Sequence, residues 1–367
     1  MLENLRVVIN SVVADKLPTD VKIKPITSDG ANFTSFIFEI TVVTAEGTLE
    51  LFAKVATNRD IEHVFVTENF VYSTLSKAYE SLQNLHGSDQ IFTFPKFYKT
   101  EAIKGVQNIV LENLASEGYK CHDRLKSMDW KYASKCVETL ANFHALSLAF
   151  GKEDPEQFKQ VEESLKLPPL TDPEWRGLAD GALAAVDGVD REKLSKLLEG
   201  SVGWSKLREL NDPRKTPVII HGDYRPSNLM HREVNGDLHV IPVDYQLTGL
   251  GCPASDLIYF IVLGSDQQFR QKYYHKLVDH YYQELVLAMT RLGLKPEVVY
   301  GRQEFEEDMR AKLPLGLCVA AQGLPFVTTD PANAATFEGG WFVPGSNELF
   351  VERFRGLMDD FNRWGFI

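Results

Sequence analysis

The stretch that decides the fold covers residues 221–228 and reads His-Gly-Asp-Tyr-Arg-Pro-Ser-Asn. A short apolar run, 217–220, precedes it and predicts a strand that enters a polar loop. A strand, a turn and a second strand are predicted after it, because Asn235-Gly236 between two apolar runs is a strong hairpin signal. Asp244 follows the hairpin directly. The predicted order is therefore strand, polar loop, hairpin and aspartate.

Three side chains of this region have the chemistry of phosphoryl transfer. Asp223 can position an attacking hydroxyl and accept its proton, while Asn228 and Asp244 supply oxygen ligands of the kind that Mg²⁺ prefers. The Asp-x4-Asn spacing equals that of the protein-kinase catalytic loop. His-Gly-Asp and Asp-Tyr-Gln, however, replace the protein-kinase sequences His-Arg-Asp and Asp-Phe-Gly. The pattern thus predicts a kinase of another kind. The alternative is an ordinary turn at 221–223 and a solvent-facing strand end at Asp244.

The chain before about residue 112 is rich in strand signals. Residues 2–17 predict a short amphipathic helix that ends at Pro18. Runs of β-branched and aromatic residues follow, separated by turn residues, and one longer run without turn residues favours a helix. We expect a compact lobe of order β-β-β-α-β-β, with strands at 21–27, 32–44, 48–56, 96–103 and 107–111 and a helix at 61–82.

Lys54 lies in an apolar run, Leu-Phe-Ala-Lys-Val, where a lone lysine needs an explanation. In protein kinases a lysine on the third strand contacts the α- and β-phosphates, and a glutamate on the next helix holds it by an ion pair. Glu68 is our candidate for that glutamate, with Glu62 and Glu80 as competitors. The alternative for Lys54 is the exposed face of an edge strand; the downstream loop favours the phosphate contact.

Two more segments of this lobe are candidates for nucleotide binding. The loop between the first two strands carries Gly30 and Asn32, and its backbone N–H groups could cover the phosphates. An ordinary hairpin turn is the alternative there. The end of the fifth strand would form a hinge whose backbone groups meet adenine, at Leu111, Glu112 and Leu114.

Helical spacing dominates from Asp129 onward, and Asp129 itself is predicted to be an N-cap. Residues 328–347 are rich in Gly, Pro, Thr and Asn and predict a loop. The length of 367 residues favours two lobes over one core. We expect an α+β fold, with an ATP-binding lobe at 1–114 that is mostly antiparallel β with one long helix. A larger α-helical lobe at 115–367 would carry catalysis and substrate binding.

The composition disfavours several classes of protein. The formal net charge of −12 argues against nucleic acid or anionic membranes as partners. No secretory signal and no apolar run long enough to span a bilayer is present, so we expect a cytoplasmic protein. The four cysteines are widely separated, which predicts free thiols rather than disulfides or a zinc site: Cys121, Cys136, Cys252 and Cys318.

Three further features of the sequence contribute less to the prediction of function. Residues 249–254 match G-x-G-x-x-A, but no acidic strand end follows about 20 residues later, so a dinucleotide site is disfavoured. His144 lies on an apolar helix face and is expected to be a core histidine. Asp256 is either a helix cap or a brace for the catalytic loop.

Taken together, the motifs resemble the ecdysteroid-kinase-like family, within the group of choline kinases and aminoglycoside phosphotransferases. The resemblance runs from about Gly30 to the final helix and is most specific at 244–246 and 253–257. Asn113 departs from it, since an aspartate is common there. The matching stretches are 110–114, 118–119, 143–147, 220–230, 243–247 and 251–260.

The resemblance implies a bilobal protein-kinase-like fold and transfer of the ATP γ-phosphate to a hydroxyl of a small molecule, classically an ecdysteroid. It implies that Asp223 is the catalytic base and that Asn228 and Asp244 bind magnesium. It also implies that Lys54 contacts the phosphates with Glu68 as its partner. We expect a monomer or a weak dimer.

The acceptor and the activity stay open at this level. A choline- or aminoglycoside-type kinase of a polar acceptor is one alternative. A nucleotide-binding pseudokinase and a purely structural protein are others, although the four catalytic positions are all occupied by functional residue types. Four aromatic residues are candidates for an apolar acceptor pocket, with the ordinary core as the alternative: Trp175, Trp204, Tyr259 and Trp341.

Overall fold

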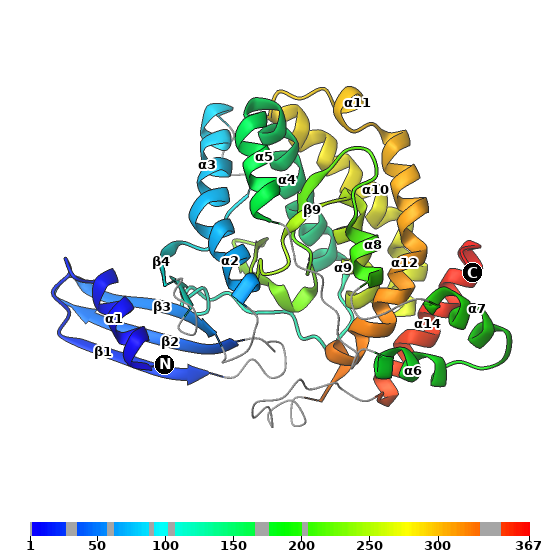
Figure 1. Ribbon diagram of the computed structural model, residues 1–367, viewed down its shortest axis with the longest axis horizontal. Coiled ribbons are helices and arrows are strands. Elements are labelled where there is room, and N and C mark those ends of the chain that lie inside the picture. The colour runs from blue at the N-terminus through cyan, green and yellow to red at the C-terminus, as the bar shows by residue number, and fades with distance from the viewer. Residues whose placement is uncertain are drawn as a thin grey trace.

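The computed structural model describes residues 2–26, 35–56, 62–87, 92–101, 107–165, 176–199, 205–330 and 346–367, without the side chains of 62–63 and 176–178. A strand-rich part near the N-terminus stands beside a larger, mainly helical part (Figure 1). This arrangement confirms the predicted α+β fold class.

The strand-rich part is a five-stranded antiparallel sheet in the order β1-β2-β3-β5-β4. Alternation of side chains gives the sheet two different faces. Leu5 and Ile9 of the helix α1 (Leu2–Val12) pack on one face, and the other face carries Lys54. The strands are β1 (Asp20–Ile26), β2 (Ser35–Thr44), β3 (Gly47–Ala56), β4 (Phe97–Glu101) and β5 (Asn108–Glu112).

One long helical run joins β3 to β4. It consists of α2 (Glu62–Phe70), a π-helical turn (Val71–Leu75) and α3 (Ser76–Leu85). Its apolar side packs against the helical part of the molecule, where the Tyr79 ring centroid lies 5.6 Å from that of Phe143. The helix predicted over 61–82 is therefore present, and it connects the sheet to the larger core.

The helical part is built around α9 (Pro253–Gly264), in which every residue is buried. The long helices α4 (Trp130–Glu153) and α10 (Gln267–Arg291) pack on each other, and α12 (Arg302–Thr328) packs on α9. Asp129 caps α4 by accepting from the Tyr132 N–H, as predicted. The remaining helices are α5 (Pro155–Ser164), α6 (Arg176–Ala184), α7 (Gly188–Leu198), α8 (Ser205–Asn211), α11 (Pro296–Val299) and α14 (Glu348–Trp364).

Within the described residues, α12 alone is long and apolar enough to cross a membrane. Its most apolar window is 78% buried inside the protein, as is typical of a core helix.

Two small antiparallel pairs carry the polar loop. β6 (Val218–Ile220) pairs with β9 (Gly249–Gly251), and β7 (Leu229–Val234) pairs with β8 (Asp237–Pro242). Asn235 and Gly236 form the predicted hairpin turn with φ values of 54° and 90°. Because β9 is antiparallel to β6, the glycine-rich match at 249–254 does not open a parallel βαβ unit.

Candidate active site

The polar loop between β6 and β7 depends on Gly222. This residue has φ of +81°, where side chains are disfavoured, and an added Cβ would lie 2.1 Å from the Leu247 carbonyl oxygen. The loop therefore approaches the segment after Asp244 so closely that only glycine fits. This contact gives a physical reason for His-Gly-Asp in place of His-Arg-Asp.

We expect Gly222→Ala to lower the free energy of unfolding by at least about 2 kcal/mol, because backbone strain adds to the clash. Gly118→Ala is the matched control, since Gly118 has φ of +83° but no atom within 4 Å of an added Cβ. It should lose only about 1 kcal/mol. Urea denaturation of both variants measures the difference. Equal losses would contradict the close packing inferred at Gly222.

His221 joins the loop to the end of β8. Its Nδ1 lies 3.3 Å from the Asp223 N–H, and its Nε2 lies 3.1 Å from the Val243 carbonyl oxygen. A backbone N–H can only donate and a carbonyl can only accept, so Nε2 carries the single ring proton. Burial lowers the pKa of His221, which agrees with a neutral ring. His221 thus fixes the distance between the loop and Asp244.

Asp256, in the first turn of α9, braces the loop from below. Its carboxylate accepts the backbone N–H groups of His221 at 2.7 Å and of Gly222 at 2.9 Å. His144 lies 3.2 Å away through Nε2 and is itself 2.7 Å from the Tyr281 hydroxyl. Burial acts to raise the pKa of Asp256, but the hydrogen bonds from the His144 side chain and the His221 N–H hold it below its ordinary value. Of the two roles predicted for Asp256, the structure shows the brace, and His144 is the predicted core histidine.

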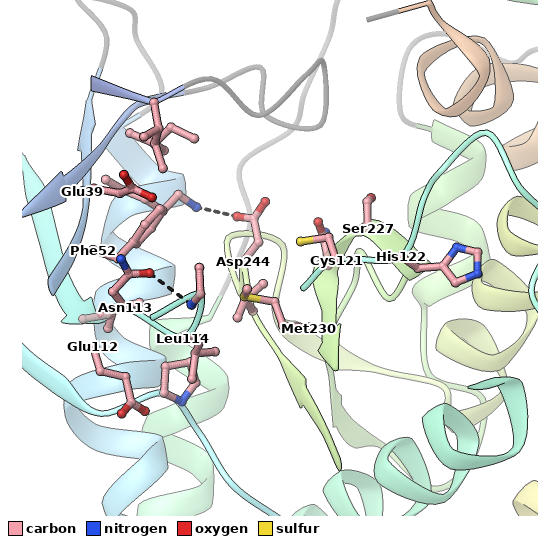
Figure 2. Close-up of a pocket in the computed structure, with 18 of the residues that line it drawn as sticks. Glu39, Phe52, Glu112, Asn113, Leu114, Cys121, His122, Ser227, Met230 and Asp244 are labelled. Carbon is pink, nitrogen blue, oxygen red and sulfur yellow. Dashed lines mark hydrogen bonds and ion pairs between the residues drawn. The ribbon is translucent and has the colours of Figure 1, made fainter. Parts of the chain in front are cut away.

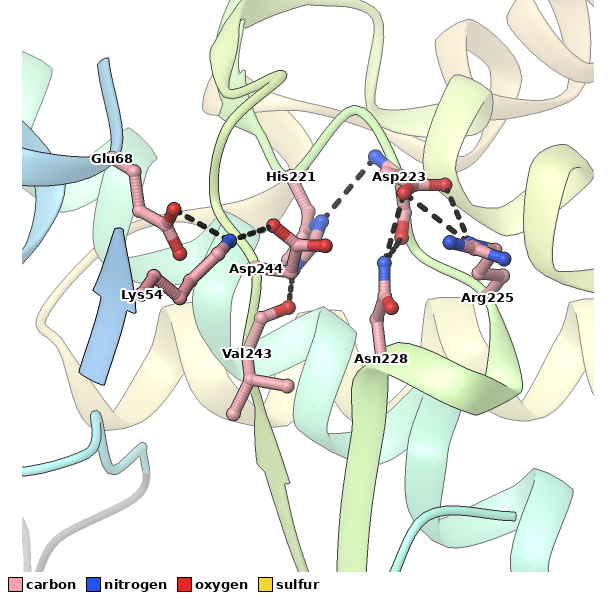
Figure 3. A network of polar contacts seen from close by, with 8 residues as sticks. All are labelled: Lys54, Glu68, His221, Asp223, Arg225, Asn228, Val243 and Asp244. Atoms are coloured by element: carbon pink, nitrogen blue, oxygen red, sulfur yellow. Dashed lines mark hydrogen bonds and ion pairs between the residues drawn. The ribbon is translucent and has the colours of Figure 1, made fainter. Parts of the chain in front are cut away.

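Three side chains hold the carboxylate of Asp223, and Figure 3 shows two of them, Asn228 and Arg225. Tyr259 donates to Oδ1 at 2.8 Å, and Asn228 Nδ2 donates to Oδ2 at 2.9 Å. The Arg225 Nε lies 3.1 Å from Oδ1 and 3.3 Å from Oδ2. All four side chains are buried. The predicted pair Asp223 and Asn228 is therefore in direct contact, and two partners not assigned by the motif complete the group.

Lys54 connects the sheet to this region (Figure 3). Its Nζ lies 2.7 Å from Glu68 Oε2 and 2.6 Å from Asp244 Oδ1. Burial lowers the pKa of Lys54, but the charges of the two carboxylates outweigh it and raise that pKa. The lysine is thus a buried ammonium. Of the competing glutamates, Glu68 is the partner, whereas Glu80 is exposed and the side chain of Glu62 lies outside the described part.

The pKa values of Glu68 and Asp244 differ in their response to the Lys54 ammonium. Burial raises the pKa of Glu68 to about 7 in spite of Lys54. Burial also acts to raise that of Asp244, yet the charge and hydrogen bond of Lys54 bring the Asp244 pKa below its ordinary value. Asp244 adopts φ of 69°, a left-handed conformation that aspartate tolerates. Asp244 thus meets Lys54 from a left-handed backbone position just after β8.

A cavity of about 510 Å³ lies between the sheet and the polar loop (Figure 2). Phe52 and Met230 face it from opposite sides, and the predicted hinge residues Leu111, Glu112 and Leu114 line one end. The Asn113 side chain accepts from the Ala115 N–H at 3.1 Å and so shapes the turn after β5. Among the hydrogen bonds of the described chain, the Leu114 N–H has no acceptor. The predicted hinge thus offers the Leu114 N–H as a hydrogen-bond donor beside the apolar side chains of the cavity.

A model of the ecdysteroid kinase-like family matches residues 29–294 of the chain. The protein belongs to this family. Membership confirms the resemblance predicted from the motifs and makes the chain a small-molecule phosphotransferase of the kinase-like superfamily, with a hydroxyl group as acceptor. No curated protein matches the chain.

Solved structures with a similar course of the chain include two kinases of small molecules. A spectinomycin phosphotransferase, in complex with ADP and spectinomycin, has 12% identity and a TM-score of 0.43, and the match covers 95% of this chain and 98% of that one. A microcompartment-associated aminopropanol kinase has 12% identity and a TM-score of 0.48, with 98% of each chain covered.

The side-chain oxygen atoms of Asn228 and Asp244 are suitable ligands for a magnesium ion. The Asn228 amide nitrogen donates to the Asp223 carboxylate and, at 3.0 Å, to the Asp223 carbonyl, which leaves its amide oxygen for a cation. Asp244 supplies a carboxylate nearby. One or two carboxylates are the usual protein contribution to a magnesium site, the rest being phosphate and water. The described residues contain no group of three or more His, Cys, Asp or Glu side chains that could hold a metal alone.

Five residues singled out in the sequence lie outside the described part of the chain: Gly30, Asn32, Trp175, Trp204 and Trp341. Sequence reasoning in turn missed Phe52, Met230, Arg225 and the role of Tyr259. Phe52 could have been found, because alternation along the third strand places residue 52 on the same face as Lys54. Met230 and Tyr259 act across segments that are distant along the chain, whereas Arg225 contacts Asp223 two positions away within the same loop.

Proposed function

We propose that the chain transfers the γ-phosphate of ATP, with magnesium, to a hydroxyl of an ecdysteroid or a similar hydrophobic alcohol. One observation carries the proposal: Lys54 and Glu68 from the sheet side meet Asp244 from the loop side, beside Asp223 and Asn228 and at the wall of a nucleotide-sized cavity.

The cavity suits an adenine nucleotide. Its apolar side chains, Phe52 and Met230, can hold a flat base between them, and the Leu114 N–H with the Glu112 carbonyl can meet its polar edge. Lys54 would contact the α- and β-phosphates, with Glu68 holding the ammonium in place. Magnesium, held by Asp244 and Asn228, would neutralise charge on the phosphates.

Asp223 would act on the acceptor. It lies in the polar loop between β6 and β7, and its carboxylate is fixed by Tyr259, Asn228 and Arg225. The acceptor hydroxyl would be oriented by this carboxylate and would lose its proton to it as the oxygen bonds to the γ-phosphorus. A pseudokinase is disfavoured, because all four catalytic positions are occupied by functional residues and Lys54 has its ion pairs.

Arg225 bears on the class of acceptor. In Figure 3 it lies on the side of Asp223 opposite to Lys54. Because donor and acceptor oxygens are roughly in line, this is the side from which the acceptor must come. The buried Arg225 guanidinium pairs with the Asp223 carboxylate and compensates its negative charge, so the carboxylate attracts a cationic acceptor less. This favours a neutral alcohol over choline or an aminoglycoside.

We also propose a lobe boundary, a localisation and an oligomeric state for the protein. The lobe boundary would fall at 114/115, directly after the hinge. The acidic composition and the burial of α12 support a soluble, cytoplasmic protein that is a monomer or a weak dimer, without nucleic acid or membrane partners.

A phosphorylation screen with mass detection tests the proposal. Purified protein with Mg-ATP would be offered ecdysone, a plant sterol glycoside, choline and spectinomycin. We expect a mass gain of one phosphate on the neutral alcohols first. Mg-ATP at a hundredfold excess over its Kd should also stabilise the fold by about 2.7 kcal/mol. No stabilisation and no product on any acceptor would refute the proposed function.

The Glu68 pKa of about 7 predicts a pH dependence of nucleotide binding. Below that pH the carboxyl takes up a proton and no longer holds Lys54 by charge, so KM for ATP should rise as pH falls from 8 to 6. In Glu68→Gln the KM should be high and nearly flat over the same range. Initial rates at fixed acceptor concentration measure both profiles, and an equally steep profile in the Gln variant would exclude Glu68 as the titrating group.

A further inference from the structure

Tyr259 is the partner of the Asp223 carboxylate that comes from outside the polar loop. From the sequence alone it belonged to an apolar wall or to the core. In the structure its hydroxyl lies 2.8 Å from Asp223 Oδ1, and the residue is 7% exposed. A hydroxyl that donates to a carboxylate makes a short, charge-assisted hydrogen bond. The side chain therefore acts through its polar end as well as its ring.

The helix α9 places this hydroxyl with little freedom. Asp256 and Tyr259 are three residues apart, so they lie on the same face of α9. Asp256 accepts hydrogen bonds from the backbone N–H groups of His221 and Gly222. Tyr259 donates to the side chain of Asp223 in the same loop. A single buried helix thus fixes the position of the loop and the orientation of its carboxylate.

The other two partners of the carboxylate have different constraints. Asn228 shares its amide between Asp223 and the proposed magnesium site, and Arg225 contacts both carboxylate oxygens through one nitrogen. Asn228 donates to Oδ2 and Arg225 contacts both oxygens, so Tyr259 is the partner that contacts Oδ1 alone. Burial, followed by the negative charge of Asp223, raises the pKa of Tyr259 far above its ordinary value, so the hydroxyl keeps its proton and remains a donor.

We propose that Tyr259 is a positioning residue for the reaction: its hydroxyl holds Asp223 Oδ1 and so fixes the orientation in which the carboxylate receives the acceptor hydroxyl. This inference rests on the proposed function of Asp223. It predicts that loss of the hydroxyl affects the chemical step and leaves the nucleotide site unchanged, because Tyr259 does not line the nucleotide cavity.

Tyr259→Phe tests the inference, with Tyr274→Phe as the matched control. Tyr274 is 9% exposed and stacks on Trp364 at 4.2 Å between ring centroids, on the neighbouring helix α10. Kinetics are measured with Mg-ATP and the best acceptor of the screen. We expect kcat of Tyr259→Phe to fall about tenfold to a hundredfold with KM for ATP unchanged. Tyr274→Phe should keep the wild-type kcat.

Two readouts separate positioning from a structural effect. The loss in Tyr259→Phe should fall on kcat and leave the Kd for Mg-ATP unchanged, whereas a general loss of structure would weaken nucleotide binding as well. In the Asp223→Asn background, Tyr259→Phe should cause little further loss, because both residues serve one step. The thermal midpoints of all variants are measured alongside.

A kcat within twofold of wild type, or a loss that adds in full to that of Asp223→Asn, would overturn the role of Tyr259. An active wild-type enzyme with such a result would leave the proposed function intact. A wild-type protein inactive on every acceptor would instead refute the proposed function, and this inference with it.

Discussion

Asp223→Asn is expected to lower kcat by about 100- to 10,000-fold, because the amide cannot accept the acceptor proton. The substitution preserves the shape of the side chain. Its amide oxygen can still accept from Tyr259 at Oδ1, but its amide nitrogen would face the donor groups of Asn228 and Arg225. We therefore expect a modest loss of stability besides the loss of the chemical step.

Nucleotide binding should survive in this variant. Asp223 does not line the cavity of Phe52 and Leu114, so the Kd for Mg-ATP, measured by calorimetry, should stay within a few-fold of wild type. Asp237→Asn is the matched control, since Asp237 is exposed at the start of β8. Full kcat in Asp223→Asn would refute the assignment of the base, whereas lost nucleotide binding would indicate a collapsed loop.

The sequence could predict the parts of this molecule that depend on local signals. The hairpin at Asn235-Gly236, the N-cap Asp129 and the apolar strand before His221 all follow from short-range preferences, and each is present. The pairing of Lys54 with Glu68 was predictable because two elements at known spacing face each other in this fold. In these cases residue type and spacing carry the information.

The helix between β3 and β4 shows where local signals weaken. Its apolar residues fit one helical face only loosely, and the structure gives the reason. The π-helical turn at Val71–Leu75 adds a residue to one turn and shifts the apolar face of α3 relative to that of α2. A period of 3.6 residues therefore cannot hold over the whole run, although length still predicts a helix.

Contacts between segments that are distant along the chain could not be predicted from the sequence. Gly222 is required because Leu247 lies against it, 25 positions later along the chain, and Tyr259 meets Asp223 only once α9 is packed below the loop. The residue types are compatible with several other roles, and the fold selects one. The catalytic loop is thus specified locally in its motif but held in place by α9 and by the segment after β8.

Lys54→Met is expected to lower the free energy of unfolding by about 3–5 kcal/mol at pH 8 and to abolish turnover. Methionine keeps an unbranched apolar stem but removes the cation. The Glu68 and Asp244 side chains, 2% and 16% exposed, would then face each other as unpaired buried carboxylates. Because Glu68 already has a raised pKa beside Lys54, loss of the lysine should raise it further.

The stability loss should therefore depend on pH. At low pH the carboxyls take up protons and the repulsion disappears, so urea denaturation at pH 5.5 should show a much smaller difference from wild type than at pH 8. Adding Glu68→Gln to Lys54→Met should restore part of the stability without restoring activity. Lys22→Met, which removes an exposed lysine of β1, should leave the unfolding free energy unchanged. A Lys54→Met protein as stable at pH 8 as at pH 5.5 would show that the two carboxylates do not depend on this lysine, and the site would need another source of positive charge.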